Sequence, residues 1–365
     1  MDRPQPRAPG NTFVSSMHIA GRSIGVAQQP YVIAEISANH RGSLAAAIEL
    51  IHAAAESGAD AVKLQHYTPD TITVRSDHSD FLVTGGTLWD GRQLADLYAE
   101  AMTPWEWTDD LAVAAEDVGI TWFSTPFDST AADFLTRYDV PAFKIASFEV
   151  IDLPLIRYVA SLGKPVIIST GMATLAEIDA AVEAAAKTET AVLRCNSGYP
   201  ALPHEMDLRA IPVMQDRWNR PIGLSDHTLG STAAIAAVAL GACIIEKHLT
   251  LRRSDGGPDA QFSAEPHEFG ALVSAMREAH ASLGQARFGP SEREVANLAF
   301  RRSLRAARPI AAGTTLTGDD VRSMRPAGGL APDDLDQVVG SVARTDLAVG
   351  DPIRWSDLHA VEGHR

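Results

Sequence analysis

Two lysines and two histidines stand inside or at the end of short apolar runs, where solvated side chains are uncommon. Lys63 and Lys144 lie within such runs, and His227 and His248 close two others. Ammonium groups in a water-poor cavity are a usual means of holding phosphate. A pair of imidazoles can bind one divalent metal, with water and substrate at its other positions. The lysines are informative because the chain has only five of them against 26 arginines.

Further polar side chains follow the apolar runs, each at the C-terminal end of its run. In chain order they are Glu35 and Asn39, Gln65, Ser124 and Thr125, Ser147, Ser169 and Thr170, Asn196, Ser197 and Tyr199, Ser225, and Glu246. One polar residue at the end of a run is ordinary, but a whole set of such ends is not explained by packing. We therefore expect these residues to gather at one site.

The apolar runs predict eight β-strands, which alternate with alanine-rich helical patterns. The strands are expected at residues 31–36, 60–65, 119–124, 142–147, 165–170, 191–196, 221–225 and 243–248. Strict alternation of strand and helix indicates a parallel sheet with right-handed crossovers. Eight units in about 250 residues are typical of a closed (β/α)₈ TIM barrel of the α/β class, whose chemistry lies at the C-terminal ends of the strands. The alternative is an open doubly wound sheet, which is disfavoured because no G-x-G-x-x-G follows the first strand.

Strand parity sharpens the expected site, because side chains two residues apart share a face. The pairs that share a face are Lys63 with Gln65, Ser225 with His227, and Glu246 with His248. Lys247 then points toward the helices, so we leave it out of the site. His227 and His248 lie on consecutive strands, which are neighbours in a barrel, so one metal could join them.

The pattern changes near Phe288. Residues 291–301 are typical of a polar linking helix, and short strands and turns follow. The predicted division is a disordered tail at 1–16, the barrel at 17–287, a linker at 288–302, a small β-rich domain at 303–358 and a tail at 359–365. About 60 residues bury little surface alone, so we expect the small domain to dock onto something larger.

The composition excludes several classes of protein. Apolar residues make up 45% and charged residues 21%, so a sizeable core is expected and wholesale disorder is excluded. The net charge of −15 disfavours a nucleic-acid binder, which usually carries a basic face. No stretch reaches the roughly 18 apolar residues of a membrane span. Residues 1–11 lack the apolar core of a secretory signal.

The two cysteines, Cys195 and Cys243, each sit in an apolar run and form no metal-type cluster. A disulfide framework is therefore not expected, and a cytoplasmic location fits. Cys195 could be a nucleophile, but no obvious base accompanies it in the sequence. A buried structural thiol is the favoured interpretation.

Seven ordered segments resemble the sialic acid synthase family, in which a metal-dependent barrel is fused to a small antifreeze-like (SAF) domain. They are A-E-I-S-A-N-H at 34–40, V-K-L-Q at 62–65, S-T-P-F-D at 124–128, K-I-A-S at 144–147, I-S-T-G-M at 168–172, G-L-S-D-H-T at 223–228 and I-E-K-H at 245–248. The resemblance runs from about residue 18 to residue 358, nearly the whole chain.

Other segments are similar to the pseudaminic acid synthase branch of that family. They are Y-T-P-D-T at 67–71, G-T-L-W-D-G at 86–91, T-P-W-E-W at 103–107 and R-S-D-G-G-P-D at 253–259. This resemblance implies condensation of phosphoenolpyruvate with 2,4-diacetamido-2,4,6-trideoxy-L-altrose. The product would be a nine-carbon 2-keto sugar acid, and phosphate would leave by C–O cleavage. N-acetylneuraminate or legionaminate synthase is the alternative within the family.

Some positions depart from the pattern of the branch. They are Arg41, His66, the C-N-S-G-Y-P segment at 195–200 and the dipeptide Ala260-Gln261. We expect them to flank the sugar rather than the metal and phosphate. They therefore bear on the identity of the sugar and leave the type of reaction unchanged.

The resemblance also implies roles for the site residues. His227 and His248 would hold a divalent metal, Mn²⁺ by preference, with Mg²⁺ or Co²⁺ as alternatives. Lys63 and Lys144 would hold phosphoenolpyruvate, and Glu35 would handle the proton of the attacking water. The other residues implied to contact substrate are Gln65, Thr125, Ser147, Ser169, Asn196, Tyr199, Ser225, Glu246, Asp259 and Arg325.

The resemblance further implies a swapped homodimer, in which the small domain of one chain covers the barrel mouth of the other and Arg325 reaches the substrate. Two other function classes remain open. A non-catalytic sugar-phosphate binder would be favoured by loss of a metal histidine, Lys63 or Glu35, and all of these are present. A barrel aldolase would use Lys144 to form a Schiff base.

Overall fold

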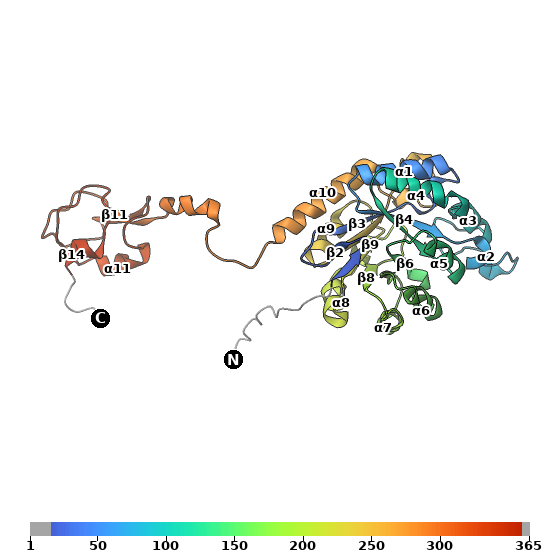
Figure 1. Cartoon of the computed structure of the whole chain (residues 1–365). Coiled ribbons are helices and arrows are strands. Elements are labelled where there is room, and N and C mark those ends of the chain that lie inside the picture. The colour runs from blue at the N-terminus through green and yellow to red at the C-terminus, as the bar shows by residue number, and fades with distance from the viewer. Residues whose placement is uncertain (1–15, 360–365) are drawn as a thin grey trace. The chain divides into compact units, whose positions relative to one another are not determined.

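The eight predicted strands close into a parallel barrel. The structure is a computed structural model, and it describes residues 16–359. Within that range the barrel strands pair in the order β10-β3-β4-β5-β6-β7-β8-β9, and the ring closes (Figure 1). The predicted TIM barrel is confirmed, and the open sheet is excluded. The strands are β3 (Tyr31–Glu35), β4 (Ala61–His66), β5 (Thr121–Pro126), β6 (Phe143–Ile145), β7 (Val166–Ser169), β8 (Thr190–Cys195), β9 (Ile222–Asp226) and β10 (Ile244–His248).

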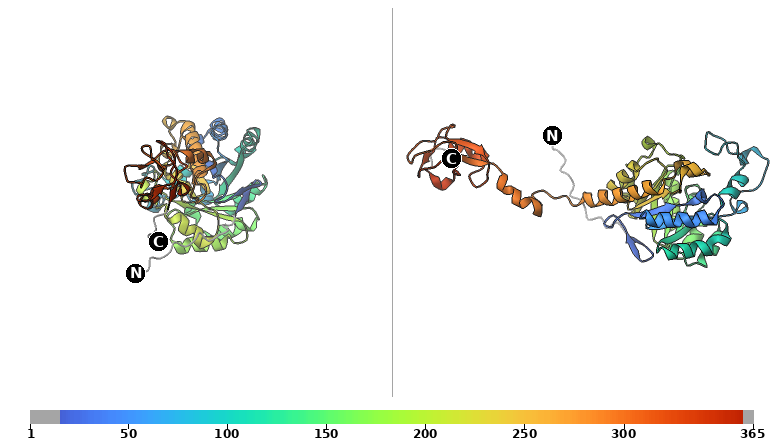
Figure 2. Two further views of the ribbon diagram at one scale, coloured as in Figure 1. Left: turned by 90° about the vertical axis from the view of Figure 1, so that its left-hand side faces the viewer. Right: turned by 90° about the horizontal axis from the view of Figure 1, so that it is seen from above.

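Helices follow the strands and surround them. They are α1 (Leu44–Glu56), α2 (Pro69–Ile72), α3 (Leu94–Ala101), α4 (Thr108–Asp117), α5 (Ser129–Thr136), α6 (Leu153–Ser161), α7 (Leu175–Ala184), α8 (Ala210–Trp218), α9 (Thr232–Ala239) and α10 (Pro266–Leu283). The long helix α10 packs beside α9 and α1, and Figure 2 shows it next to α1 from above.

Side-chain caps fix where several of these helices begin. Thr174 accepts from the backbone N–H of Glu177, whose carboxylate accepts in return from the Thr174 backbone, so α7 starts with a capping box. Asp128 and Asp152 cap α5 and α6 in the simpler way. These caps end the loops that follow the strands, so they help to place the polar residues at the strand ends.

The barrel interior has an apolar half and a polar half. Inward-facing residues at the N-terminal ends of the strands, such as Ile33, Phe123, Leu193 and Ile244, are fully buried. A side chain at Gly223 would lie 2.4 Å from the Ile244 carbonyl oxygen and 2.5 Å from Leu193, so only glycine fits there. This packed half seals one end, and the polar residues occupy the other end.

A short hairpin that we do not predict covers the apolar end of the barrel. Strands β1 (Met17–Ile19) and β2 (Arg22–Ile24) pair antiparallel around a tight turn with positive φ at Ala20 and Gly21. Met17, Ile19 and Ile24 are buried and join the same apolar cluster as Ile33 and Phe123.

The described chain separates into two compact units between Gly284 and Gln285. The second unit begins with a 3₁₀ helix, η8 (Glu292–Phe300), where we predict a linking helix. It continues with β11 (Ser303–Ala306), β12 (Val321–Met324), α11 (Leu335–Val338), β13 (Val342–Ala343) and β14 (Leu358–His359). Its own apolar core includes Leu304, Ile310 and Ile353.

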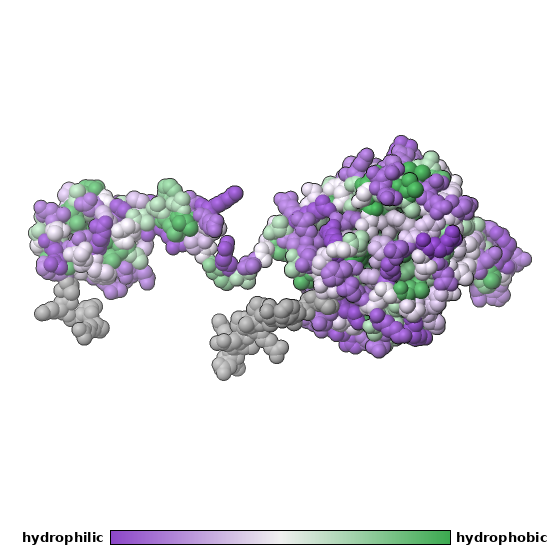
Figure 3. Space-filling view, in the orientation of Figure 1, coloured by the Kyte–Doolittle hydropathy of each residue, from purple (hydrophilic) through white to green (hydrophobic). Residues whose placement is uncertain are grey.

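The predicted tails fall mostly on residues 1–15 and 360–365, which lie outside the described residues. His359, which we assign to the C-terminal tail, pairs with Val342 in a strand. The face of the barrel unit visible in Figure 3 is mostly hydrophilic with small scattered apolar areas, as the composition suggests. No helix among the described residues is long and apolar enough to cross a membrane.

Candidate active site

Lys63 binds two buried carboxylates on the floor of the polar half. Its Nζ, on β4, pairs with the Glu35 carboxylate on β3 and lies 3.2 Å from Glu246 Oε1 on β10. The same Nζ donates to Thr125 Oγ1 on β5 at 3.3 Å. The residues are almost inaccessible to water, with exposed fractions of 0% for Glu35, 3% for Lys63 and 4% for Glu246. Their charges are therefore screened little by solvent.

Lys144 approaches the Glu246 carboxylate from β6, which lies across the barrel from β10. Its Nζ lies 3.8 Å from Glu246 Oε1 and donates to Ser169 Oγ on β7 at 2.6 Å. Ser225 on β9 donates its hydroxyl to the same Glu246 oxygen at 3.2 Å. Glu246 thus joins the two lysines, and seven of the eight strands contribute a polar side chain to one cluster.

The shifts in pKa show how this cluster divides its charge. Burial raises the pKa of Glu35, although Lys63 opposes the shift. Burial would also raise the pKa of Glu246, but Lys144 and Lys63 outweigh it and lower that pKa. Burial would lower the pKa of Lys63, but Glu246 and Glu35 raise it. For Lys144 burial dominates and lowers the pKa to about 8, despite Glu246. A bound anion would therefore stabilise the charged form of Lys144 more than that of Lys63, whose pKa is already raised by two carboxylates.

Small polar groups lie beside this cluster, at the start of η4 (Ser147–Glu149) and in the loop after β7. Ser147 Oγ accepts from the backbone N–H of Gly171 at 3.0 Å. A Cβ atom at Gly171 would lie 2.1 Å from Ser197 Oγ and 2.9 Å from Ser147 Oγ. Only glycine lets these groups approach one another, and together they offer hydroxyl groups to an anion, with Ser147 held by the Gly171 N–H.

His227 lies just beyond β9 with one ring nitrogen already bound. Its Nδ1 lies 2.8 Å from the Asn196 carbonyl oxygen, which can only accept, so Nδ1 carries the proton. In the neutral ring, its Nε2 then keeps the lone pair that a metal-binding imidazole requires. Burial would lower the pKa of His227, but Cys195, the Asn196 carbonyl and Glu246 outweigh burial and raise it.

His248, at the end of β10, is the neighbour that strand order predicts. The two imidazole centroids are 5.4 Å apart. His248 Nδ1 is buried without a hydrogen-bond partner among the described residues, and the nearest carboxylate, Asp259, is 3.9 Å away. Burial and the nearby cations hold the pKa of His248 well below its usual range, so its ring stays neutral.

These observations fit a divalent metal. A neutral imidazole with an orphaned buried nitrogen and a second imidazole with a fixed tautomer are suitable ligands. Among residues 16–359, no group of three His, Cys, Asp or Glu side chains is ready to hold a metal. The remaining ligands of such a metal would therefore be water or substrate, as we predict from the sequence.

Aromatic rings form one wall of the site above the histidines. Tyr199, in the loop after β8, packs against His227 with the ring centroids 4.4 Å apart and the rings tilted by 40°. Phe262 lies 4.9 Å from His248 and 5.0 Å from Tyr199. Trp89, from the long connection after β4, lies 5.5 Å from Tyr199. The predicted residue Tyr199 is thus next to the candidate metal ligands.

Asn196, Gln65 and Arg325 are not part of the buried cluster. The Asn196 side chain bonds within its own loop, because its Oδ1 accepts from Gly198 N–H at 2.8 Å and its Nδ2 donates to the Glu205 carbonyl at 3.0 Å. Gln65 shares the inward face of β4 and is half-buried. Arg325 is exposed in the second unit, directly after β12. Their predicted contacts with substrate stay predictions.

The expectation that His66 flanks the sugar is wrong. His66 is fully buried on the outer face of β4, where its ring nitrogens lie 2.7 Å from Ser124 Oγ and 3.0 Å from Thr108 Oγ1. Ser124 is accordingly turned away from the barrel interior. Arg41 lies in the loop after β3 and contacts Asp255 in the loop after β10, with Arg41 Nη2 3.4 Å from Asp255 Oδ2.

Cys195 is buried, as we predict, and the His227 imidazole lies close to it. Its Sγ lies 3.9 Å from His227 Nδ1. Burial would raise the pKa of this thiol, but His227 outweighs burial and lowers it to about 7. The sequence could not show this contact, because the two residues are on different strands.

Glu149 is a half-buried acid near the site that the sequence reasoning misses. It lies two residues after Ser147, its Oε2 has no hydrogen-bond partner among the described residues, and burial raises its pKa to about 7. Lys144 opposes that shift, so the carboxyl group lies within the electrostatic reach of this lysine. A carboxyl group with this pKa can exchange protons near neutral pH. Its place at the end of a barrel strand was a signal in the sequence.

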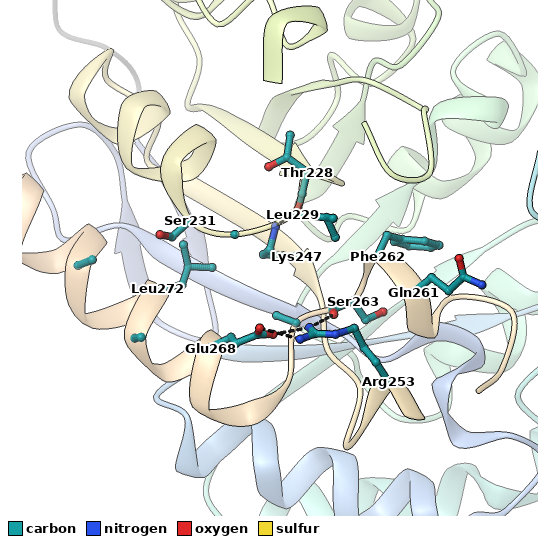
Figure 4. A pocket seen from close by; sticks show the side chains of 14 residues that line it. Thr228, Leu229, Ser231, Lys247, Arg253, Gln261, Phe262, Ser263, Glu268 and Leu272 are labelled. Carbon is teal, nitrogen blue, oxygen red and sulfur yellow. Dashed lines mark hydrogen bonds and ion pairs between the residues drawn. The ribbon is translucent and has the colours of Figure 1, made fainter. Parts of the chain in front are cut away.

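A cavity of about 640 Å³ lies beside the barrel, between the loop after β9 and α10, and Figure 4 shows its lining. Its two cations are already paired. Arg253 Nη2 lies 2.7 Å from Glu268 Oε1, and Lys247 Nζ lies 2.7 Å from Asp226 Oδ2. Lys247 thus points away from the site, as parity predicts, and this cavity is separate from the lysine cluster.

The chain is similar to known synthases over most of its length. The NeuB family matches residues 50–288 and the SAF domain matches residues 301–359. A pseudaminic acid synthase of Campylobacter jejuni is 42% identical over 90% of this chain and 96% of its own length. An N,N'-diacetyllegionaminic acid synthase of Legionella pneumophila is 34% identical over 90% of this chain and 95% of its own.

A solved structure agrees with these relatives. The N-acetylneuraminic acid (sialic acid) synthetase of Leptospira borgpetersenii, in complex with citrate, has a TM-score of 0.70 and 30% identity, and covers 78% of this chain and 95% of that one. The family match spans more than half of the chain, and it includes most of the barrel strands described above. This chain belongs to the NeuB family and carries a C-terminal SAF domain.

Proposed function

We propose that this protein is a pseudaminic acid synthase-type enzyme. It would condense phosphoenolpyruvate with the open-chain aldehyde of 2,4-diacetamido-2,4,6-trideoxy-L-altrose, take up water and release phosphate. The observation that carries the proposal is the pair of buried lysines joined by Glu246, next to two imidazoles, in a chain 42% identical to a pseudaminic acid synthase. The cluster offers cations and hydroxyls to a small trianion, and the rings above it offer a place for the sugar.

Lys63 and Lys144 would bind the phosphate and carboxylate of phosphoenolpyruvate. Lys144 is the stronger candidate for phosphate, because it has one carboxylate nearby, Glu246 at 3.8 Å, whereas Lys63 pairs with both Glu35 and Glu246. An anion there would restore the charge that burial disfavours. Ser147 and Ser225 would complete the cradle with hydroxyl groups. The Ser225 hydroxyl would turn from Glu246 to the ligand, and the Gly171 N–H holds Ser147 in place.

His227 and His248 would hold a divalent metal, Mn²⁺ by preference. When bound, such a metal polarises a carbonyl oxygen as a Lewis acid. The Asn196 carbonyl keeps the His227 ring in the orientation and tautomer that leave Nε2 free. The Tyr199 ring packs against His227 and limits its rotation.

The bond changes balance without an added oxidant or reductant. C3 of phosphoenolpyruvate bonds to the aldehyde carbon, the aldehyde oxygen takes a proton, and water adds at C2 and loses a proton. The C2–O bond to phosphate then breaks and its electron pair leaves with the phosphate, while the C2 hydroxyl gives its proton to the phosphate and becomes the ketone. Glu35 and Glu149 have raised pKa values that suit them to move these protons.

A homodimer in which the SAF domain of one chain covers the barrel of its partner is also part of the proposal, as is a cytoplasmic location. The separate core of the second unit supports the swapped homodimer, because this unit can fold as a body of its own. The two free cysteines support the cytoplasmic location.

A substrate panel tests the proposed function. Purified protein with Mn²⁺ and phosphoenolpyruvate is offered the trideoxy-altrose, its legionaminate-precursor isomer, or N-acetylmannosamine, and phosphate release is measured. We expect the fastest release with the altrose. Preference for either other sugar would assign the chain to that activity, and no release with any of them would overturn the synthase proposal. Trapping with borohydride and pyruvate should label no lysine, because the synthase forms no imine.

A further inference from the structure

The connection between β4 and α3 carries a rigid loop with Trp89 at its tip. Residues 82–93 fold back on themselves, with Leu82 bridged to Gln93 and the Val83 N–H donating to the Arg92 carbonyl at 2.8 Å. The Asp90 carboxylate accepts from the backbone N–H groups of Gly86 and Thr87 at 2.8 and 2.9 Å. The loop is therefore closed by its own hydrogen bonds before any substrate arrives.

Trp89 connects this loop to two others at the mouth of the barrel. Its Nε1 donates to the Pro258 carbonyl oxygen, in the loop after β10, at 3.1 Å. Its ring lies 5.5 Å from that of Tyr199, in the loop after β8, which in turn lies 4.4 Å from His227. The indole is thus fixed in place, and its only polar atom is already bonded.

The rings also differ in depth. His227 is buried with 5% of its surface exposed, whereas Tyr199 and Trp89 are half-buried and the neighbours of Trp89 are exposed. Trp89 therefore lies at the outer end of the row. The aldehyde carbon of the sugar must reach phosphoenolpyruvate near the lysines. The opposite end of the sugar, C6, then lies toward the mouth of the barrel.

We propose that Trp89, backed by Tyr199, is a specificity-determining residue that receives the C6 methyl group of a 6-deoxy sugar. This inference rests on the proposed synthase function and adds the part of the substrate that the chain discriminates. A methyl group packs favourably on the indole face. On the indole face, a C6 hydroxyl would lose water without gaining a hydrogen bond from Trp89, because Nε1 of Trp89 is committed to Pro258.

The expected discrimination is modest, because an apolar surface rejects an added hydroxyl by a factor of only about 10 to 100. The test compares two sugars that differ at one position: 2,4-diacetamido-2,4,6-trideoxy-L-altrose and its counterpart with a C6 hydroxyl. The measured quantity is the ratio of their kcat/KM values, with KM for phosphoenolpyruvate determined alongside.

Two variants separate the ring from its hydrogen bond. Trp89→Phe keeps an apolar ring and removes the N–H, and Trp89→Gln keeps an N–H donor and removes the ring. We expect Trp89→Phe to retain most of the discrimination and Trp89→Gln to reduce the ratio to within about 3-fold of unity, since the apolar contact is the source of the preference. KM for phosphoenolpyruvate should stay within about 3-fold in both, because the anion cradle is elsewhere.

Trp218→Gln is the matched control. Trp218 is also half-buried and donates its Nε1 to Asp179 Oδ1 at 2.8 Å, but it lies at the end of α8, outside the barrel. It should leave the ratio unchanged. The inference is overturned if Trp89→Gln keeps the preference, or if Trp89→Phe loses it as fully as Trp89→Gln does. A wild-type protein that releases no phosphate with either sugar overturns the proposed function instead.

Discussion

Nδ1 of His227 lies 2.8 Å from the carbonyl oxygen of Asn196. A carbonyl cannot donate, so this contact fixes the proton on Nδ1 and leaves the lone pair on Nε2. The departure of this chain from its branch at residue 196 does not disturb the contact, because the backbone supplies the acceptor. The side chain of Asn196 instead holds the loop that brings the carbonyl into position.

The first prediction is that His227 and His248 together bind a divalent metal. His227→Ala and His248→Ala should each weaken Mn²⁺ binding at least about 10-fold, because a two-histidine site has no protein ligand to replace the lost one. Isothermal titration with Mn²⁺ measures this, and circular dichroism checks the fold. His267→Ala, an exposed residue of α10, is the control. Unchanged Mn²⁺ binding in both site variants would refute the assignment.

The second prediction concerns pH. The pKa of Lys144 is lowered to about 8 by burial, so the amine is charged below that pH and neutral above it. The kcat/KM value for phosphoenolpyruvate, which reports the free enzyme, should therefore fall as pH rises through about 8. In Lys144→Arg the cation cannot deprotonate in this range, so the fall should disappear or move to higher pH. An alkaline fall that is identical in the variant would show that another group titrates.

The third prediction contrasts two buried lysines, Lys63 inside the barrel and Lys247 on the outer face of β10. Lys63→Met should lower kcat/KM, with a loss of transition-state stabilisation of about 2–4 kcal/mol, because a charge-assisted contact to substrate is lost in a dry site. Lys247→Met should leave kcat/KM of the folded protein nearly unchanged and lower the free energy of unfolding by about 3–5 kcal/mol, since Asp226 stays buried without its partner.

Denaturant unfolding and steady-state kinetics on the same preparations measure both quantities. Lys164→Ala is a surface control, because Lys164 is partly exposed and pairs with the exposed Asp139. Loss of activity in Lys247→Met without loss of stability would mean that strand parity misplaced this residue.

The barrel and its lysine cluster were predictable because they depend on regular patterns. Each barrel strand is a short apolar run, and parity decides which residues face inward. Parity also places His66 on the outer face, and our expectation that it flanks the sugar neglected this rule. Its bonds to Ser124 and Thr108 show that it belongs to the layer between strand and helix.

The hairpin and the aromatic row were not predictable in the same way. β1 and β2 have three residues each, with the polar residues His18 and Arg22 among them, so no apolar run marks them. The contacts among Trp89, Tyr199 and Pro258 join loops far apart in the sequence. Loop conformation depends on tertiary contacts, so local patterns do not determine it.

The last prediction concerns Arg325, which is exposed in the SAF domain and makes no ion pair with any described residue of this chain. If the SAF domain of one chain covers the barrel of its partner, this arginine supplies a positive group to the partner's substrate. Arg325→Ala and His227→Ala chains should then be nearly inactive as separate homodimers. Refolded together, they should recover activity, because the intact barrel of the Arg325→Ala chain receives the intact SAF domain of its partner.

The same mixture distinguishes the alternative arrangement. If each SAF domain covered the barrel of its own chain, every barrel would either lack His227 or face a SAF domain that lacks Arg325. Mixing the two chains would then restore no activity. Affinity tags on the two chains allow mixed dimers to be isolated before the assay, and Arg344→Ala in place of Arg325→Ala controls for loss of any SAF-domain arginine. Verified mixed dimers without recovered activity would exclude the swapped arrangement while leaving the chemistry of the barrel intact.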